Sequence, residues 1–376
     1  MKRILHVVGT RPNFMKIGPI MLEMAKYPDE FSQTLVHTGQ HYDTAMSEVF
    51  FEELELPFPE VNLEVGSGSH AQQTAQVMLR FEPVVLKYDP DWVIVVGDVN
   101  STLASTLVCS KLGIKVAHVE AGLRSFDQSM PEEINRILID HVADLLFTSE
   151  PSGNDNLRRE GIPAGKIHFV GNVMIDTLVR LLPKAQTRWY ELQEQFNLSR
   201  YALVTLHRPS NVDNPERLSE IIGALNDLGK YVAVLFPIHP RTHQRLDENR
   251  LPYSNSNLRS LPPLSYLDFL ALEAHAEFVI TDSGGIQEET SFLGVPCLTV
   301  RPSTERPITI TNGTNRLVSA KRSDLLTKSL AILECRDLMR TVTDHRTIST
   351  GIPLELWDGH TAERIVKVLL ERPVHC

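Results

Sequence analysis

Short apolar runs alternate with longer amphipathic stretches along the whole chain. The run at residues 92–96 is continuously apolar, which is typical of a strand buried on both faces of a sheet. From Phe14 to Met24 the apolar residues instead recur at helical spacing. Strands are predicted at 4–8, 92–96, 115–119, 145–147 and 167–170, and in a second series at 201–206, 232–236, 278–280 and 297–300.

The helix-length segments between these strands indicate right-handed βαβ units and parallel sheets. One hydrophobic core stops growing at roughly 250–300 residues. A chain of 376 residues is therefore expected to form two domains. We predict an α/β fold with two Rossmann-like domains, residues 1–170 and 171–360, joined near 171–200 by a helical connector. A last apolar helix within 361–376 can cap either domain, and we expect it on the first.

The charge balance is acidic, with 37 Lys and Arg against 47 Asp and Glu and a formal net charge of −10. Such a chain is a poor general partner for phosphate backbones, so nucleic acid is not expected. A small anionic ligand needs only a local cationic pocket and remains compatible with this balance.

The cysteines and the apolar segments indicate a cytoplasmic protein. No segment approaches the roughly 18 uninterrupted apolar residues of a membrane span, so no membrane partner is expected. The cysteines are widely spaced without a CxxC pair, which fits a reducing compartment and argues against disulfides and thiolate metal sites. They are Cys109, Cys297, Cys335 and Cys376.

Several cofactor and catalytic motifs are absent from the sequence. The chain has no GxGxxG, so a nicotinamide or flavin cofactor has little support, and no GxxxxGK[ST] for a P-loop. It also has no GxSxG elbow and no HExxH. We therefore expect neither a bound metal nor an organic cofactor.

In open parallel sheets, ligands gather at the carboxyl ends of the strands. Ser283, Gly284 and Gly285 follow such a strand directly. Two glycines let the backbone approach a ligand, and the N–H groups of the next helix favour a phosphate. The alternative is an ordinary tight turn with Ser283 as helix N-cap.

Basic residues follow several other predicted strands. Arg11 and Lys16 come after the first strand, where they could clamp a pyrophosphate or simply be solvated surface charges. Arg306 follows the strand at 297–300. His207 and His239 end two further strands, and each is either a phosphate contact or a structural histidine.

Three carboxylates are predicted at one edge of the first sheet. Asp98 could be catalytic or could cap the next helix, and Glu120 ends the strand at 115–119. Glu132 has complete local alternatives, a capping box with Ser129 and an ion pair with Arg136. Crowding of carboxylates separates their pKa values, as acid–base chemistry requires.

Taken in order, these segments resemble the UDP-N-acetylglucosamine 2-epimerase family. The resemblance extends from about residue 3 to DGHTAERI at Asp358. The matching stretches are GTRPNFMKIGP from Gly9, TGQH from Thr38, VVGDVNSTLAS from Val95, HVEAGLRS from His118, MPEEINR from Met130, TLHRPSN from Thr205, TDSGGIQEE from Thr281 and TERP from Thr304.

The resemblance implies a GT-B-like fold, with a UDP-sugar in the cleft between the two domains and residues 171–360 supplying most of the UDP binding. It implies reversible conversion of UDP-N-acetylglucosamine to UDP-N-acetylmannosamine by elimination of UDP to 2-acetamidoglucal and re-addition. The implied catalytic residues are Asp98, Glu120, Glu132 and His207. The implied substrate-binding residues are Arg11, Lys16, Arg136, His239, Ser283, Gly284, Gly285, Glu289 and Arg306, with Glu289 accepting both ribose hydroxyls.

The chain departs from the family pattern in two places. The segment between HVEAGLR and PEE is shorter than in many bacterial members, and their HRRE stretch reads HRPS from His207. In the family these regions, with a QHR stretch that here reads QHY from Gln40, help to bind an activating UDP-N-acetylglucosamine. These departures count against extending allosteric activation to this chain.

The sequence is also compatible with other functions. A hydrolysing epimerase that releases UDP and N-acetylmannosamine would use the same residues. A non-catalytic nucleotide-sugar-binding protein would be expected to lack one of the three carboxylates, and a GT-B glycosyltransferase would need an acceptor groove. We expect the protein to form a homodimer.

Overall fold

The computed structural model describes residues 1–39, 51, 53–342 and 354–372. The chain divides into two compact units. Unit 1 comprises Met1–Arg180 and Glu355–Cys376, and unit 2 comprises Leu181–Leu354. The division falls inside one long helix, α7 (Val173–Gln195). Gln40-His41-Tyr42 and Cys376 lie outside the described residues.

Unit 1 contains a parallel sheet of seven strands in the order β3-β2-β1-β4-β5-β6-β7. All of its strand pairs are parallel. The strands are β1 (Lys2–Val8), β2 (Phe31–His37), β3 (Val61–Asn62), β4 (Trp92–Val96), β5 (Lys115–Ala121), β6 (Leu145–Thr148) and β7 (Ile167–Phe169).

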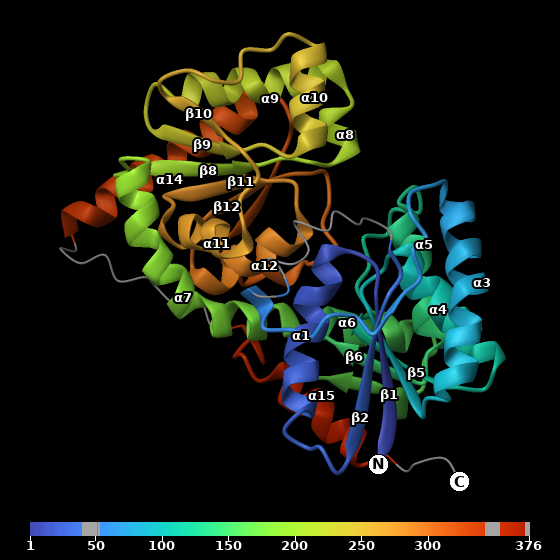
Figure 1. Cartoon of the computed structure of the whole chain (residues 1–376). Coiled ribbons are helices and arrows are strands. Elements are labelled where there is room, and N and C mark those ends of the chain that lie inside the picture. Colours follow the sequence, from blue (N-terminus) through green and yellow to red (C-terminus); the bar gives the residue numbers. More distant parts are fainter. Residues whose placement is uncertain (40–50, 52, 343–353, 373–376) are drawn as a thin grey trace. The chain divides into compact units, whose positions relative to one another are not determined.

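Helices cover both faces of this sheet. Figure 1 shows α3 and α4 on one side and α1 and α15 on the other, and α15 packs against α1. The helices of unit 1 are α1 (Arg11–Met24), α3 (His70–Tyr88), α4 (Asn100–Lys111), α5 (Pro131–Val142), α6 (Pro151–Arg159), the first part of α7 and α15 (Thr361–Leu370).

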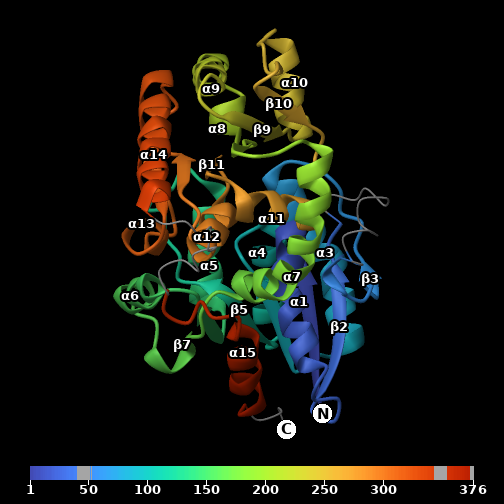
Figure 2. The ribbon, with the colours of Figure 1, turned by 90° about the vertical axis from the view of Figure 1, so that its left-hand side faces the viewer.

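Unit 2 repeats the design with a parallel sheet of six strands in the order β10-β9-β8-β11-β12-β13. Figure 2 labels three of these strands, β9, β10 and β11. The strands are β8 (Tyr201–Thr205), β9 (Ala233–Pro237), β10 (Leu258–Leu261), β11 (Phe278–Thr281), β12 (Cys297–Val300) and β13 (Asn315–Val318). The helices are α8 (Pro209–Val212), α9 (Pro215–Leu228), α10 (Pro240–Glu248), α11 (Tyr266–His275), α12 (Gly284–Leu293), α13 (Ile308–Thr311), α14 (Arg322–Val342) and the second part of α7.

The prediction of an α/β fold with two parallel sheets is confirmed, and every predicted strand is present. The continuous apolar run of β4 is fully buried, as expected for a central strand. Four further strands were not predicted: β2, β3, β10 and β13. They are short, or they carry polar residues such as the Ser-Gln-Thr of β2, so they lack the apolar signal that marks the central strands.

The C-terminal segment is bound to unit 1 by specific hydrogen bonds. Trp357 Nε1 donates to the carbonyl of Ser149 at 2.9 Å, and Lys2 Nζ donates to the carbonyl of Leu369 at 2.8 Å. The Asp176 carboxylate accepts the first N–H groups of α15, from Thr361 at 3.1 Å and Ala362 at 2.7 Å. Burial raises the pKa of Asp176 to about 6 in spite of these donors.

No helix in the described ranges is long and apolar enough to span a membrane.

Gly171 provides a test of how the C-terminal segment packs against the rest of unit 1. Its φ is +94°, and a Cβ there would lie 2.0 Å from the carbonyl oxygen of Leu356. Gly161 has a φ of +83°, but a Cβ there would meet nothing within 4 Å. Gly161→Ala is therefore expected to lower the free energy of unfolding by about 1 kcal/mol, from the left-handed backbone alone.

Gly171→Ala adds a backbone displacement and should lower the free energy of unfolding by about 3 kcal/mol. Urea unfolding of the two variants measures the difference, since both residues belong to unit 1. Equal losses would show that the approach of Leu356 to Gly171 is unimportant.

Candidate active site

Asn13 holds the loop after β1 in place. Its Oδ1 accepts the backbone N–H groups of Gly9 and Thr10, both at 3.0 Å, and its Nδ2 donates to the carbonyl of Val96 at 3.2 Å. The carboxyl ends of β1 and β4 are thereby joined through one buried side chain. Arg11 is the first residue of α1, exposed beside this loop.

Lys16 and Glu120 form a buried ion pair, with side chains 10% and 7% exposed. Lys16 is therefore not a solvated surface charge, which was the alternative to a pyrophosphate contact. The pair lies against Gly97, because a Cβ there would be 3.3 Å from Lys16 Nζ and 3.7 Å from Glu120 Oε2. Glu120 also interrupts the β5–β6 register and has a φ of +72°, a conformation that costs a non-glycine residue energy. Such strain is frequent at functional sites.

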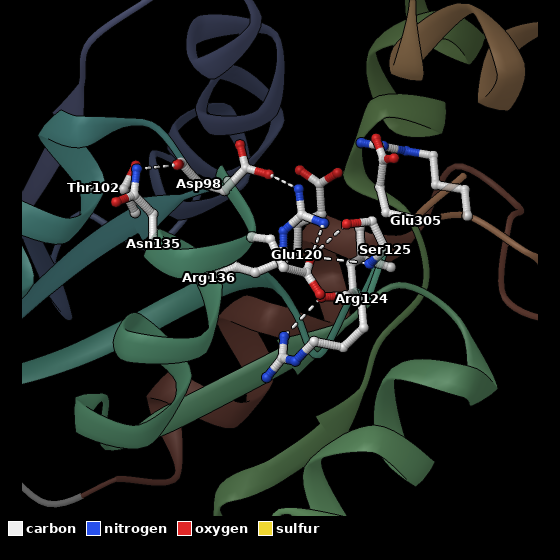
Figure 3. Close-up of polar contacts among 12 residues, drawn as sticks. Asp98, Thr102, Glu120, Arg124, Ser125, Asn135, Arg136 and Glu305 are labelled. Atoms are coloured by element: carbon white, nitrogen blue, oxygen red, sulfur yellow. Dashed lines mark hydrogen bonds and ion pairs between the residues drawn. The ribbon is translucent and has the colours of Figure 1, made fainter. Parts of the chain in front are cut away.

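Asp98, directly after Gly97, faces Arg136 of α5. Figure 3 shows the carboxylate and the guanidinium pointing toward one another, and they form an ion pair. The Asp98 side chain is 33% exposed, whereas that of Arg136 is 4% exposed. Asn135 donates to the carbonyl of Asp98 at 2.8 Å. α4 has Val99 at its N-cap position with no side-chain cap, so the interpretation of Asp98 as its cap is wrong.

The two adjacent glutamates of α5 have different environments. Glu133 is 1% exposed and accepts Ser125 N, Ser125 Oγ and Phe126 N, each at 2.9 Å, as well as Arg136 Nη1 at 2.8 Å. Glu132 is half-buried, and the structure gives it no hydrogen bond among the described residues. Both local alternatives for Glu132 are wrong, because Met130 is the N-cap and Arg136 pairs with Glu133 and Asp98.

A buried histidine supports the turn that carries Asp98. The His118 ring lies between the carbonyl of Gly97 (Nε2, 2.8 Å) and Asp140 (Nδ1, 2.7 Å). Asp140 also binds Arg124 Nη1 at 2.8 Å. Burial opposes the charge of Asp140, but His118 and Arg124 hold its pKa below the usual value. These contacts hold the Gly97 carbonyl in place.

In unit 2, Asp282 positions His207. The carboxylate lies 3.1 Å from His207 Nδ1 and accepts the backbone N–H groups of His207 and Arg208 and the Nδ2 of Asn211, each at 3.0–3.1 Å. Burial opposes the charge of Asp282, but these hydrogen bonds, led by that of His207, lower its pKa. The His207 side chain is 43% exposed, and Nε2 is the nitrogen remote from Asp282.

The Ser-Gly-Gly turn forms the start of α12. Ser283 occupies the N-cap position, but its side chain makes no cap hydrogen bond. Gly284 allows Arg306 to lie against the turn, since a Cβ would be 2.7 Å from Arg306 Nη1. Gly285 follows in the first helical turn, which offers N–H groups to an anion.

Arg306 is itself paired with buried carboxylates. Its Nε lies 2.7 Å from Glu288 Oε1, and its Nη1 pairs with Glu305. Arg301 binds the other oxygen of Glu305 at 2.6 Å. The guanidinium of Arg306 is thus held rigidly beside the helix N-terminus.

Glu289 and His239 complete the predicted set in unit 2. Glu289 is 2% exposed in α12 and accepts the hydroxyl of Tyr266 at 2.7 Å. His239 is the N-cap of α10, and its Nδ1 accepts the N–H of Arg241 at 3.2 Å. The rings of His207 and His239 are 6.1 Å apart, which brings the ends of β8 and β9 together.

Sequence reasoning overlooked the side chains that position the candidates. Asp282 stands in the TDSGG stretch at a strand end and could have been found by the same criterion as Asp98. Asn13, Glu133 and Asp140 lie within helices, where only the structure reveals their partners. The described residues contain no cluster of three or more His, Cys, Asp or Glu arranged to hold a metal ion.

The different environments of Glu132 and Glu133 predict that their substitution affects stability differently. Glu133→Gln replaces an acceptor oxygen by an NH₂ group that faces N–H donors, so it should lower the free energy of unfolding by about 2–3 kcal/mol. Glu132→Gln is the matched control and should change that free energy by less than about 0.5 kcal/mol. Chemical denaturation measures both, and an equally damaging Glu132→Gln would contradict the assigned roles.

Comparison with known proteins identifies the family of this chain. The family model for UDP-N-acetylglucosamine 2-epimerase matches residues 23–370. A UDP-N-acetylglucosamine 2-epimerase homolog of Methanococcus maripaludis is 44% identical over 98% of this chain and 99% of its own. The UDP-2,3-diacetamido-2,3-dideoxy-D-glucuronate 2-epimerase of Pseudomonas aeruginosa is 42% identical over 98% and 99%. The crystal structure of Methanocaldococcus jannaschii UDP-GlcNAc 2-epimerase, in complex with UDP-GlcNAc and UDP, is 41% identical with a TM-score of 0.86, covering 98% of this chain and 99% of that one. The chain belongs to the UDP-N-acetylglucosamine 2-epimerase family.

Proposed function

We propose that the protein interconverts UDP-N-acetylglucosamine and UDP-N-acetylmannosamine without net hydrolysis, by elimination of UDP and re-addition to 2-acetamidoglucal. The observation that carries the proposal is the group at the carboxyl edge of the unit 1 sheet, where the Lys16–Glu120 pair and the Asp98–Arg136 pair flank Gly97. Family membership supplies the substrate class. Residues of each unit are assigned a part in this proposal.

The chemistry explains why both sets are needed. The proton on carbon 2 of the sugar is weakly acidic, so departure of the UDP oxygen must lead the reaction, and the developing charge must be stabilised. In unit 2 we assign this role to His207, Arg306 and the N–H groups at Ser283-Gly284-Gly285. His239 and Glu289 contact the nucleotide, and Arg11 adds a cation from unit 1.

In unit 1 we assign proton transfer at carbon 2 to the carboxylates. Epimerisation needs removal of the proton from one face and return to the other, so more than one carboxyl group must reach the carbon. Asp98, Glu120 and Glu132 form that set. Lys16 and Arg136 neutralise the charge of two of them and fix their positions.

Solvent isotope incorporation tests the reaction. Incubation with UDP-N-acetylglucosamine in deuterated water should place deuterium at carbon 2 of both UDP-sugars, as followed by NMR. Complete retention of protium in the epimerised product would overturn the elimination mechanism. Free N-acetylmannosamine as the main product would instead identify a hydrolysing enzyme.

The same assay distinguishes UDP-N-acetylglucosamine from a second candidate substrate. A 42% identical relative is named for a diacetamido-glucuronate substrate. Turnover of that UDP-uronate with none of UDP-N-acetylglucosamine would replace the proposed substrate while retaining the reaction class.

Asp98→Asn tests the carboxylate set. The variant should lose 10²–10⁴-fold in kcat, the usual contribution of a general acid or base, because the amide accepts no proton. UDP affinity should stay within about twofold, because Asp98 is assigned to the sugar and not to the nucleotide. Asp155→Asn is the control, an exposed carboxylate on α6 that pairs only with Arg158 among the contacts described. Full activity of Asp98→Asn would remove Asp98 from the catalytic set.

A further inference from the structure

A buried side chain binds the backbone directly before Asp98. Gly97 follows Val96, which with Val119 forms the last residue pair of the β4–β5 ladder. His118 of β5 is 0% exposed, and its Nε2 lies 2.8 Å from the carbonyl oxygen of Gly97. The peptide group that leads into Asp98 is therefore held by an imidazole ring and not by the sheet.

Both ring nitrogens of His118 face hydrogen-bond acceptors. A carbonyl oxygen has no hydrogen to donate, so Nε2 must carry a proton to bind Gly97. Nδ1 lies 2.7 Å from Asp140 Oδ1. The other oxygen of Asp140 accepts the N–H of Gly122 at 3.0 Å and lies 2.8 Å from Arg124 Nη1. A carboxyl group that receives a guanidinium and a backbone N–H is ionised, so Nδ1 carries the second proton.

The charges of this cluster balance when His118 is doubly protonated. Arg124 binds Asp140, and it also binds both oxygens of Glu160, at 2.8 Å from Nε and 2.7 Å from Nη2. One guanidinium thus serves two carboxylates. His141 lies 4.0 Å from Glu160, but its side chain is 44% exposed. An imidazolium at His118, where both partners are shielded from water, supplies the second positive charge.

Helix α5 supports His118 and also binds Asp98 directly. Asp140 stands four residues after Arg136, so the two side chains lie on the same side of the helix. Arg136 forms the ion pair with the Asp98 carboxylate, and Asn135 donates to the Asp98 carbonyl at 2.8 Å. The carbonyl before Asp98, its own carbonyl and its carboxylate are therefore all held by α5, the first of them through His118.

We propose that His118 is a positioning residue, an imidazolium that holds the Gly97 carbonyl and thereby directs the Asp98 carboxylate toward carbon 2 of the sugar. The inference rests on the proposed function, which assigns proton transfer to Asp98. His118 is buried and acts on the reaction only through the turn. A displacement of about 1 Å in a catalytic group lowers a rate by roughly 100-fold, so such support has a measurable effect.

Two substitutions separate the contacts of His118. The amide nitrogen of glutamine is as many bonds from Cβ as Nε2 of histidine, and that of asparagine is as many bonds away as Nδ1. His118→Gln therefore keeps a donor for Gly97 and loses the donor for Asp140, whereas His118→Asn does the reverse. Both variants lose the same charge, so each is the matched control of the other.

Steady-state kinetics with UDP-N-acetylglucosamine and urea unfolding distinguish positioning from mere stability. His118→Asn should lower kcat by about 10–100-fold, with KM and UDP affinity within about twofold, because only the direction of Asp98 changes. His118→Gln should keep kcat within about threefold. It should nevertheless lose more stability than His118→Asn, because it removes a donor from the buried carboxylate of Asp140. The order of the two variants is thus opposite in kcat and in stability.

Each outcome decides a definite point. Equal losses of kcat in the two variants, or losses of kcat that follow the losses of stability, would overturn the inference. Full activity of His118→Asn would overturn it as well. A wild type that does not epimerise UDP-N-acetylglucosamine would instead overturn the proposed function.

Neutron diffraction keeps the proposal testable if neither variant folds. Crystals of perdeuterated wild-type protein at neutral pH should show deuterium on both Nδ1 and Nε2 of His118, and on neither carboxylate oxygen of Asp140. A ring that carries a single deuterium, or a deuterium on Asp140, would overturn the assignment of His118 as an imidazolium and the inference with it.

Discussion

Buried carboxylates must be compensated, and this requirement organises both units. Removing a charged oxygen from water is costly unless a cation or a donated proton accompanies it. In unit 1 the compensation comes from cations, with Lys16 beside Glu120 and Arg136 between Asp98 and Glu133. The partners fix the position of each acid at the edge of the sheet.

Backbone turns are fixed by the same means. The Glu133 side chain accepts hydrogen bonds from N–H groups of the loop after β5, and the Asn13 side chain accepts them from N–H groups of the loop after β1. Each of these side chains belongs to the helix that follows the loop. The helices therefore fix the loops on which the candidate site residues lie. Side-chain hydrogen bonds therefore hold the functional loops in place, which is what reactions sensitive to small displacements require.

The sequence predicts the central part of this design better than its edges. Continuous apolar runs identify β4 and β11 because both of their faces are covered, whereas β2 and β13 carry polar residues and give a weaker signal. Strand ends locate the candidate carboxylates, but the sequence cannot distinguish Glu132 from its buried neighbour Glu133. Their difference depends on which side of α5 faces the preceding loop.

The return of the chain to unit 1 has a consequence for biosynthesis. Unit 2 is one continuous segment, while unit 1 is completed only by the residues from Glu355 onward, which bond to Lys2 through Leu369 and to Asp176 through Thr361. The ribosome therefore releases all of unit 2 before it releases the last helix of unit 1. Domains usually become complete in order from the N-terminus. Here the order is reversed, and the first unit to be translated is the last to be finished.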